Sequence, residues 1–203
     1  MHVAVASYKG GVGKTTTAVH IAAYLQTLAP TLLLDGDPTH NATEWQQRGS
    51  GFPFEIADVR SAMKRAGQYK HSVIDTGQRP SDTDLKHLAE GCDLLVIPAV
   101  PLALDTDGLR LTIEALQRMN VKHYRVLITK APPPPETEAQ QLKAMLDGLK
   151  VPVFKTSVPR LKAYSKASAT GVLVSQVDDA RAARAWEAYE AIGKEVVKYA
   201  SAS

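Results

Sequence analysis

Residues 9–16 read Lys-Gly-Gly-Val-Gly-Lys-Thr-Thr, directly after the apolar run at residues 2–6 and directly before a helix-like run that ends at Leu28. The glycines at positions 10, 11 and 13 let the backbone turn tightly, so its N–H groups can converge on an anion at the start of the helix. A strand, a glycine-rich loop and a helix in this order predict a loop that binds nucleotide phosphates.

The polar residues of this loop have separate expected roles. Lys14 is placed to neutralise the β- and γ-phosphates, and the hydroxyl of Thr15 is placed to ligate Mg²⁺. The loop residues expected to contact the cofactor are Gly10, Gly11, Val12, Gly13, Lys14, Thr15 and Thr16.

Apolar runs rich in Val, Ile and Leu alternate with stretches of helical period along the chain. Several runs, such as 32–34 and 94–97, are continuous, which indicates strands buried on both faces. The expected strands are 2–7, 31–35, 53–57, 71–75, 93–98, 123–129 and 151–155. The expected helices are 14–28, 58–67, 80–90, 105–119, 137–148, 160–169 and 179–199. We therefore predict an α/β P-loop NTPase with a mostly parallel central sheet and helices on both faces, as one domain over residues 1–203.

Acidic residues follow two of the expected strands, at Asp35 and Asp37 and again at Asp75. The carboxyl ends of parallel strands meet at one edge of a sheet, so these side chains are expected beside the phosphate loop. There they could hold a metal's water shell and orient an attacking water. The predicted metal set is Thr15, Asp35, Asp37 and Asp75.

Position 8 carries Tyr8, where the general P-loop pattern has glycine, and Lys9 follows it. The form Lys-Gly-Gly-x-Gly-Lys-[Ser/Thr] resembles the deviant Walker A motif of the ParA and MinD superfamily, in the small ParA type without an N-terminal helix-turn-helix domain. The resemblance implies an ATPase with ATP and Mg²⁺ as cofactors and an ATP sandwich homodimer, in which Lys9 reaches the partner's nucleotide. It implies catalytic roles for Lys9, Lys14 and Asp37, and it makes Asp75 the Walker B aspartate.

Two further segments bear on the resemblance. After Thr76 most relatives have Pro-Pro, whereas this chain reads Gly-Gln-Arg-Pro over residues 77–80, which resembles the carboxysome-positioning McdA group. Whether Gln78 and Arg79 act on a water or on a partner subunit stays open. Lys130 and Pro159 fall where ParA relatives pass the adenine ring and are the predicted base contacts, although a Pro-Arg dipeptide is more often a simple turn.

The basic charge is concentrated towards the C-terminus. From residue 150 onward nine Lys and Arg stand against five Asp and Glu, in a chain of net charge +3. Such a segment can hold DNA without sequence preference or can be solvated surface. The resemblance favours DNA, because relatives carry DNA-contacting arginines at the positions of Arg160 and Arg184. The predicted DNA-binding set is Arg160, Lys162, Arg181 and Arg184, with Lys166 as a further candidate.

Several classes of protein are not expected. No stretch approaches the roughly 20 apolar residues of a membrane span, and the first residues lack the basic region of a signal peptide. The tail Ala-Ser-Ala-Ser at 200–203 lacks the basic and apolar cluster of a membrane anchor. Cys92 is the single cysteine, which excludes an internal disulfide and paired-cysteine metal sites. A cytoplasmic, nucleoid-associated protein is expected.

The predicted function is a positioning ATPase for a plasmid, a chromosome locus or a protein organelle. Its ATP-bound homodimer would bind nucleoid DNA non-specifically, and a ParB-like or cargo-adaptor protein would stimulate hydrolysis and release it. Two alternatives stay open. One is an ATP-dependent metabolic ligase of the same fold, which would need a dedicated substrate pocket. The other is a nucleotide-dependent regulatory switch that barely hydrolyses ATP.

Overall fold

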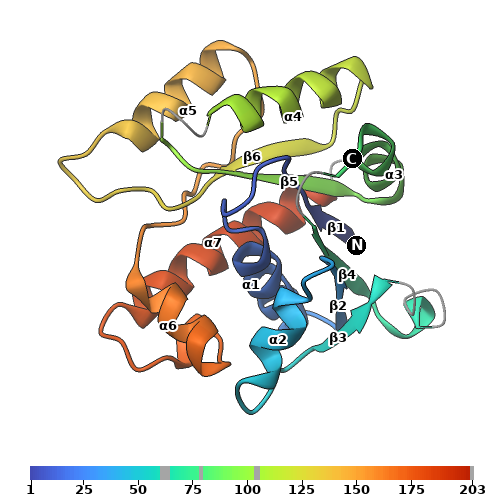
Figure 1. Cartoon of the computed structure of the whole chain (residues 1–203), viewed down its shortest axis with the longest axis vertical. Coiled ribbons are helices and arrows are strands. Elements are labelled where there is room, and N and C mark those ends of the chain that lie inside the picture. Colours follow the sequence, from blue (N-terminus) through green and yellow to red (C-terminus); the bar gives the residue numbers. More distant parts are fainter. Residues whose placement is uncertain (60–64, 78–79, 103–105, 202–203) are drawn as a thin grey trace.

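The computed structural model describes residues 1–59, 65–77, 80–102 and 106–201 (Figure 1). In this part of the chain, one six-stranded sheet has the order β3-β2-β4-β1-β5-β6. Its strands are β1 (His2–Val5), β2 (Thr31–Gly36), β3 (Glu55–Asp58), β4 (His71–Thr76), β5 (Leu94–Ala99) and β6 (Tyr124–Ile128). All pairings between these strands are parallel. The predicted α/β class with a parallel sheet is confirmed.

Helices cover both faces of this sheet (Figure 1). They are α1 (Lys14–Gln26), α2 (Asn41–Gln47), α3 (Asp82–Gly91), α4 (Thr106–Arg118), α5 (Glu138–Gly148), α6 (Lys162–Thr170) and α7 (Ala182–Ala200), with 3-10 turns η2 (Ala66–Gln68) and η4 (Val174–Gln176). Successive residues of β1 point to opposite faces. Val3 and Val5 join the core formed with α1, α2, α6 and α7, here called the first core. Ala4 and Ala6 join the second core, formed with α3, α4 and α5.

The parallel register places the ends of the central strands at one edge. Asp35 of β2 lies beside Asp75 of β4, and Asp75 lies beside Val5 of β1. The loop that follows β1 therefore emerges next to the ends of β2 and β4, as the sequence predicted.

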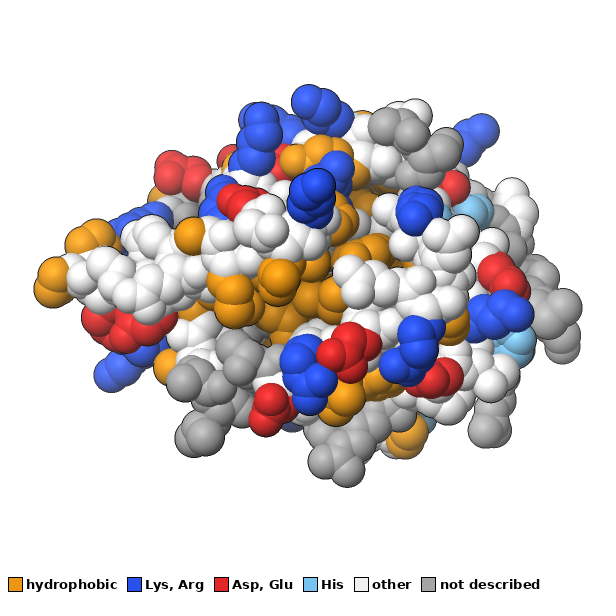
Figure 2. All heavy atoms as spheres, turned by 90° about the horizontal axis from the view of Figure 1, so that it is seen from above, with side chains coloured by type: hydrophobic (Ala, Val, Ile, Leu, Met, Phe, Trp, Pro, Cys, Tyr) orange, Lys and Arg blue, Asp and Glu red, His pale blue; other side chains and the backbone are white. Residues whose placement is uncertain are grey.

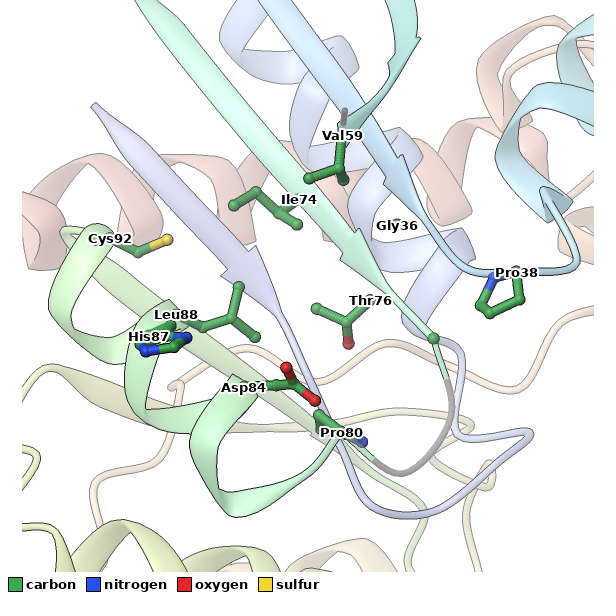
Figure 3. A pocket seen from close by; sticks show the side chains of 12 residues that line it. Gly36, Pro38, Val59, Ile74, Thr76, Pro80, Asp84, His87, Leu88 and Cys92 are labelled. Carbon is green, nitrogen blue, oxygen red and sulfur yellow. The ribbon is translucent and has the colours of Figure 1, made fainter. Parts of the chain in front are cut away.

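The second face is hollowed in two places. Figure 2 shows apolar side chains gathered in a hollow over α4 and α5. This α4–α5 groove has a volume of about 400 Å³, and its apolar lining consists of Leu109, Ile113, Met145, Leu146, Leu149 and Val151. A second hollow of about 500 Å³ lies between α3 and the ends of β2 and β4 (Figure 3). Ile74, Thr76 and Asp84 line this α3 pocket.

The strand predicted over 151–155 does not form. Val153 makes only an isolated parallel bridge with Val126. The pairing with β6 is then interrupted, because the N–H groups of Lys155 and Thr156 donate to the carboxylate of Glu195 at 2.8 and 2.9 Å; it resumes only at Val158, whose N–H donates to the carbonyl of Ile128. Their hydrogen bonds go to a helix and are not available to extend a strand.

One predicted helix and one unpredicted helix are further differences. The helix predicted over 58–67 starts where β3 still includes Asp58; residues 60–64 lie outside the described part, and residues 66–68 form the turn η2. Helix α2 was not predicted from the sequence. Helix α2 starts here because Oδ2 of Asp35 accepts from both the N–H and the hydroxyl of Thr43, at 2.9 and 2.7 Å.

Candidate nucleotide-binding site

The loop between β1 and α1 has the backbone that its glycines allow. Gly11 and Gly13 have φ of 73° and 88°, a left-handed conformation that strains other residues. Gly13 precedes the first residue of α1, and no side chain of the described residues caps that helix end. The first turn also carries no acidic residue. The N–H groups of this turn, with their partial positive charge, are therefore available to an anion.

The end of β6 supports the loop from behind. The hydroxyl of Thr129 donates to the carbonyl of Val12 at 2.8 Å, and the ammonium of Lys130 donates to the carbonyl of Gly11 at 2.7 Å. Lys130 was predicted as a base contact. The structure places its ammonium on the phosphate loop, and the residue also lines the adjoining hollow described below.

Lys14 lies over the loop. Its side chain is buried, and its ammonium donates to the carbonyl of Lys9 at 3.2 Å. Burial lowers the pKa of Lys14, while the charges of Asp75 and Asp37 act in the opposite direction. The cation is therefore near both carboxylates and at the mouth of the loop, where it can meet a phosphate.

Asp35, near the end of β2, and Asp37, just after it, have buried carboxylates that already accept from protein donors. Asp35 accepts from the N–H of Asp37 at 3.3 Å and from Thr43, as described above. Asp37 accepts from the N–H and the hydroxyl of Thr39 at 2.9 and 2.7 Å. These bonds give the segment between β2 and α2 a defined shape.

Asp75, at the end of β4, differs from them. Its side chain is fully buried, yet neither carboxylate oxygen has a hydrogen-bond partner among the described residues. Burial raises the pKa of Asp75 to about 7; the nearby hydroxyl of Thr15 acts in the opposite direction, whereas Asp35 and Asp37 raise it further. An unsatisfied buried carboxylate is costly, and a hydrated cation placed against Thr15 would remove that cost.

The available side-chain oxygens fit a Mg²⁺ ion that is coordinated mainly by water and by nucleotide phosphates. The described residues contain no group of three or more His, Cys, Asp or Glu that could hold a metal by themselves. Mg²⁺ usually keeps several waters and binds one or two protein oxygens together with substrate phosphates. Thr15 and Asp75 suit that arrangement. Asp35 and Asp37, also in the predicted metal set, contribute charge nearby. Both oxygens of Asp35 accept from protein donors, whereas the two bonds to Asp37 go to its Oδ1 alone.

Two hollows meet at the loop. One, of about 340 Å³, is lined by Gly11, Gly13, Lys14, Thr15, Thr16, Asp37, Asn41 and Lys130. The other, of about 350 Å³, shares Gly13, Thr16 and Lys130 with it and extends past Pro159 to Tyr164 and Tyr189. Together they form a continuous site with a phosphate end and an apolar end large enough for a base. Sequence reasoning missed Asn41 and Tyr164; Tyr164 carries no local signal, because only the packing of α6 brings it to the site.

The predicted DNA-binding residues lie at the surface, and several have acidic partners. Arg160 contacts Glu136 at 2.8 Å, and Arg181 lies 3.8 Å from Asp179. The further candidate Lys166 contacts the same aspartate at 2.7 Å. The other two members, Lys162 and Arg184, are exposed in α6 and α7. Gln78 and Arg79 lie outside the described residues. Within the described part of the chain, no helix is long and apolar enough to span a membrane.

Comparisons with known proteins agree with this geometry. The family model for the CobQ/CobB/MinD/ParA nucleotide binding domain matches residues 3–174. The "Maintenance of carboxysome distribution protein A" of Gloeobacter kilaueensis is 31% identical over 200 residues, covering 96% of this chain and 93% of that protein. The predicted resemblance to the McdA group is thereby confirmed.

Solved structures share the fold. A putative plasmid partition protein from Borrelia burgdorferi bound to AMPPNP has a TM-score of 0.75 at 17% identity, covering 97% of this chain and 98% of its own. The septum site-determining protein MinD of Pyrococcus horikoshii, complexed with Mg-ADP, has a TM-score of 0.71 at 15% identity, covering 98% and 96%. Their ligands agree with ATP and Mg²⁺ as the predicted cofactors. This chain belongs to the CobQ/CobB/MinD/ParA family of nucleotide-binding domains and is a P-loop ATPase of the ParA/MinD type.

Proposed function

We propose that this chain is a spatial-positioning ATPase that acts as an ATP-dependent homodimer on DNA. One observation carries the proposal: in this family member, Lys9 directly precedes a complete phosphate loop, and the loop faces the buried Asp75, whose carboxylate oxygens have no hydrogen-bond partner among the described residues. The whole chain, residues 1–203, would form the ATPase domain. The resemblance to this family implies that Lys9 reaches the nucleotide bound by the second copy of the chain.

Each residue of the site has a task in this cycle. The N–H groups of the loop and the ammonium of Lys14 bind the phosphates. Asp37 orients the attacking water, and Thr39 keeps its carboxylate in place through the two bonds described above. Bound Mg²⁺ would be held by Thr15 and, through its waters, by Asp75 and Asp35, and it would neutralise charge on the phosphates. Pro159 and Lys130 line the end that would receive adenine.

DNA binding is the second part of the proposal. Lys162 and Arg184 are exposed and can meet phosphates directly. Arg160 and Arg181 would exchange Glu136 and Asp179 for phosphate oxygens, an exchange with little cost because surface ion pairs contribute little. Contacts of this kind carry no base preference and weaken as salt is raised. They suit a protein that moves over the nucleoid in the cytoplasm.

A partner protein, ParB-like or a cargo adaptor, would stimulate hydrolysis and release the dimer from DNA. The cargo would be a plasmid, a chromosome locus or a protein organelle. The name of the Gloeobacter relative, which refers to carboxysome distribution, favours an organelle.

The test is Lys9→Ala, with Lys122→Ala as the matched control, since Lys122 is an exposed lysine just before β6, at the opposite edge of the sheet. With ATP and Mg²⁺, the wild type and the control should dimerise and bind a random-sequence DNA duplex. Lys9→Ala should keep its melting temperature but weaken dimerisation at least about 30-fold, because truncating one member of a buried charge pair has effects of that size.

An ATP-dependent dimer of Lys9→Ala as tight as that of the wild type would contradict the proposal. So would ATP turnover that rises with a small carboxylic acid and an amine but not with DNA and a partner, which would identify a ligase. Light scattering over a range of protein concentrations measures the first outcome, and phosphate release measures the second.

A further inference from the structure

Tyr8, which replaces the glycine of the general P-loop pattern, has no role in the site described so far. Its ring is partly buried against the second core, and its hydroxyl donates to one carboxylate oxygen of Asp82, the first residue of α3. Arg118, the last residue of α4, lies 3.4 Å from the other oxygen of Asp82. One phenol therefore connects the phosphate loop to α3 and, through the arginine, to α4.

The backbone of the loop is also attached to α4. The N–H of Tyr8 donates to the hydroxyl of Thr112 at 3.4 Å, and that hydroxyl donates to the carbonyl of Gly108 at 2.7 Å. Gly108 is so close to the loop that a Cβ added there would lie 2.9 Å from the Cβ of Lys9. The first turns of α4 thus pack directly on the lysine that defines the motif.

Lys9 is restrained from its own side as well. Its N–H donates to the hydroxyl oxygen of Ser7 at 3.2 Å, and its carbonyl accepts from Lys14 at the same distance. With Tyr8 attached to α3 and α4, the backbone on both sides of the Lys9 side chain has a defined direction. A glycine at position 8 would keep the backbone bond to Thr112 but would lose the contact with Asp82 of α3.

The anchor on α3 is itself rigid. Ser81 and Asp84 form a reciprocal capping box at the start of the helix, with bonds of 2.9 and 3.1 Å between backbone and side chains. A carboxylate in the first turn, such as that of Asp82, is also favoured by the helix dipole. Burial, followed by the contact with Asp82, raises the pKa of Tyr8 to about 12, so the phenol remains a donor at neutral pH.

We propose that Tyr8 is a positioning residue for Lys9. The contact from its phenol to Asp82, reinforced by Arg118, sets the direction in which the Lys9 side chain leaves the loop toward a second copy of this chain. The inference rests on the proposed ATP-dependent dimer and adds to it a residue that prepares Lys9 in the monomer. Because the free monomer already holds the backbone on both sides of Lys9, less conformational freedom is lost on association.

The chain contains a chemically matched control. Tyr69 donates its hydroxyl to Glu55, and Glu55 also pairs with Arg65, so a second set of tyrosine, carboxylate and arginine exists. Tyr69 lies two residues before the start of β4, at the sheet edge opposite the phosphate loop. The Tyr69→Phe variant removes the same kind of tyrosine–carboxylate contact at a position far from the phosphate loop.

The experiment compares Tyr8→Phe with Tyr69→Phe. Dimerisation is followed by light scattering against protein concentration with AMPPNP and Mg²⁺, and nucleotide affinity is measured at protein concentrations where the chain is monomeric. Tyr8→Phe should raise the dimer dissociation constant about three- to tenfold, the range for one hydrogen bond to a partly exposed charged group. Its monomer should bind nucleotide as the wild type does, and Tyr69→Phe should change neither quantity.

A conservative pair of variants sharpens the test. Asp82→Asn keeps an oxygen that can accept from the phenol but loses the charge and the contact with Arg118, so its dimer dissociation constant should lie between those of the wild type and Asp82→Ala. Asp82→Ala should match Tyr8→Phe. A rescue of this kind is not expected if position 82 acts only through the general stability of α3.

Two results would overturn the inference. One is a Tyr8→Phe protein that dimerises as the wild type does. The other is a Tyr8→Phe monomer that loses nucleotide affinity in proportion to its dimerisation, because Tyr8 would then support the whole loop. Lys9→Ala separates this inference from the proposed function: if that variant dimerises with ATP, the proposed function fails, whereas if only Tyr8→Phe dimerises normally, the positioning role alone fails.

Discussion

The two faces of the sheet are built in different ways. The first core contains buried polar groups that have partners: Thr17 contacts the hydroxyl of Tyr189 at 3.2 Å, and the indole N–H of Trp45 donates to the carbonyl of Val172 at 3.0 Å. The second core is mostly aliphatic and is hollowed by the α4–α5 groove and the α3 pocket (Figures 2 and 3). Directional bonds specify one arrangement, whereas apolar packing alone specifies shape less strictly. The directional bonds of the first core adjoin the hollow of the nucleotide site that is lined by Tyr164 and Tyr189.

His20 is at the centre of that directional face. Its ring stacks on Tyr189 at 4.6 Å and meets the edge of Trp45 at 5.7 Å. The N–H of Val174 donates to its Nε2 at 3.1 Å, so the proton is on Nδ1, which lies 2.7 Å from the carbonyl of Thr16. A neutral histidine thus links the first turn of α1 to η4, and its neighbours come from α2 and α7.

The largest effect is expected where α2 and α6 meet through glycines. A Cβ at Gly171 would lie 2.1 Å from the backbone N of Gly49, and Gly171 has φ of 71°. Gly171→Ala should lower the free energy of unfolding by about 3 kcal/mol or more, because backbone atoms cannot move aside cheaply. Urea unfolding measures the change.

Gly51→Ala is the control for backbone strain. Gly51 has φ of 92°, and a Cβ there would meet nothing within 4 Å. Gly51→Ala should lower the free energy of unfolding by only about 1 kcal/mol. Equal losses for the two variants would show that the contact between α2 and α6 contributes nothing beyond strain.

A medium effect on the free energy of unfolding is expected when the pH is lowered, because His20 is buried in its neutral form. Burial lowers the pKa of His20 to about 4, with the contact to Thr16 acting in the opposite direction. Between about pH 6.5 and 4 the unfolded chain binds a proton that the folded chain excludes, so this contribution to stability is complete above 6.5 and is lost as pH falls. The loss at pH 5 should be about 2 kcal/mol.

Urea unfolding of the wild type and of His20→Phe at pH 7.5 and 5 isolates this contribution. The carboxylates titrate in both proteins, so the difference between the two pH dependences belongs to His20. If both proteins lose the same stability between these pH values, His20 is not buried in its neutral form.

The smallest effect on the free energy of unfolding is expected on the face that carries the second core. Leu149, beside the α4–α5 groove, is 64% exposed. Leu149→Lys should change the free energy of unfolding by no more than about 0.5 kcal/mol, because little apolar area leaves or enters water. A loss above about 2 kcal/mol would show that this side chain is covered in the protein in solution.

The local elements near the site were predictable because their signals are local. The glycines, Lys14 and Thr15 lie within a few residues of one another, and the continuous apolar runs identified the buried strands. The departures have non-local causes. Glu195, far along the chain, accepts from the N–H groups of Lys155 and Thr156, where the strand predicted over 151–155 would have ended. Asp35 likewise starts α2 from the end of another element.

The amino-acid sequence by itself determined the nucleotide loop, the α/β class and the family resemblance, because short-range spacing specifies backbone turns and strand burial. Only the tertiary structure decided which polar groups have partners. Asp35, Asp37 and Asp75 look alike in the sequence, but packing leaves both oxygens of Asp75 without a partner in the described residues. Tyr8 looked like a mere departure from a motif until the fold brought Asp82 and Arg118 to it. Hydrogen bonds between residues far apart in sequence depend on where the whole chain places them, and no local pattern carries that information.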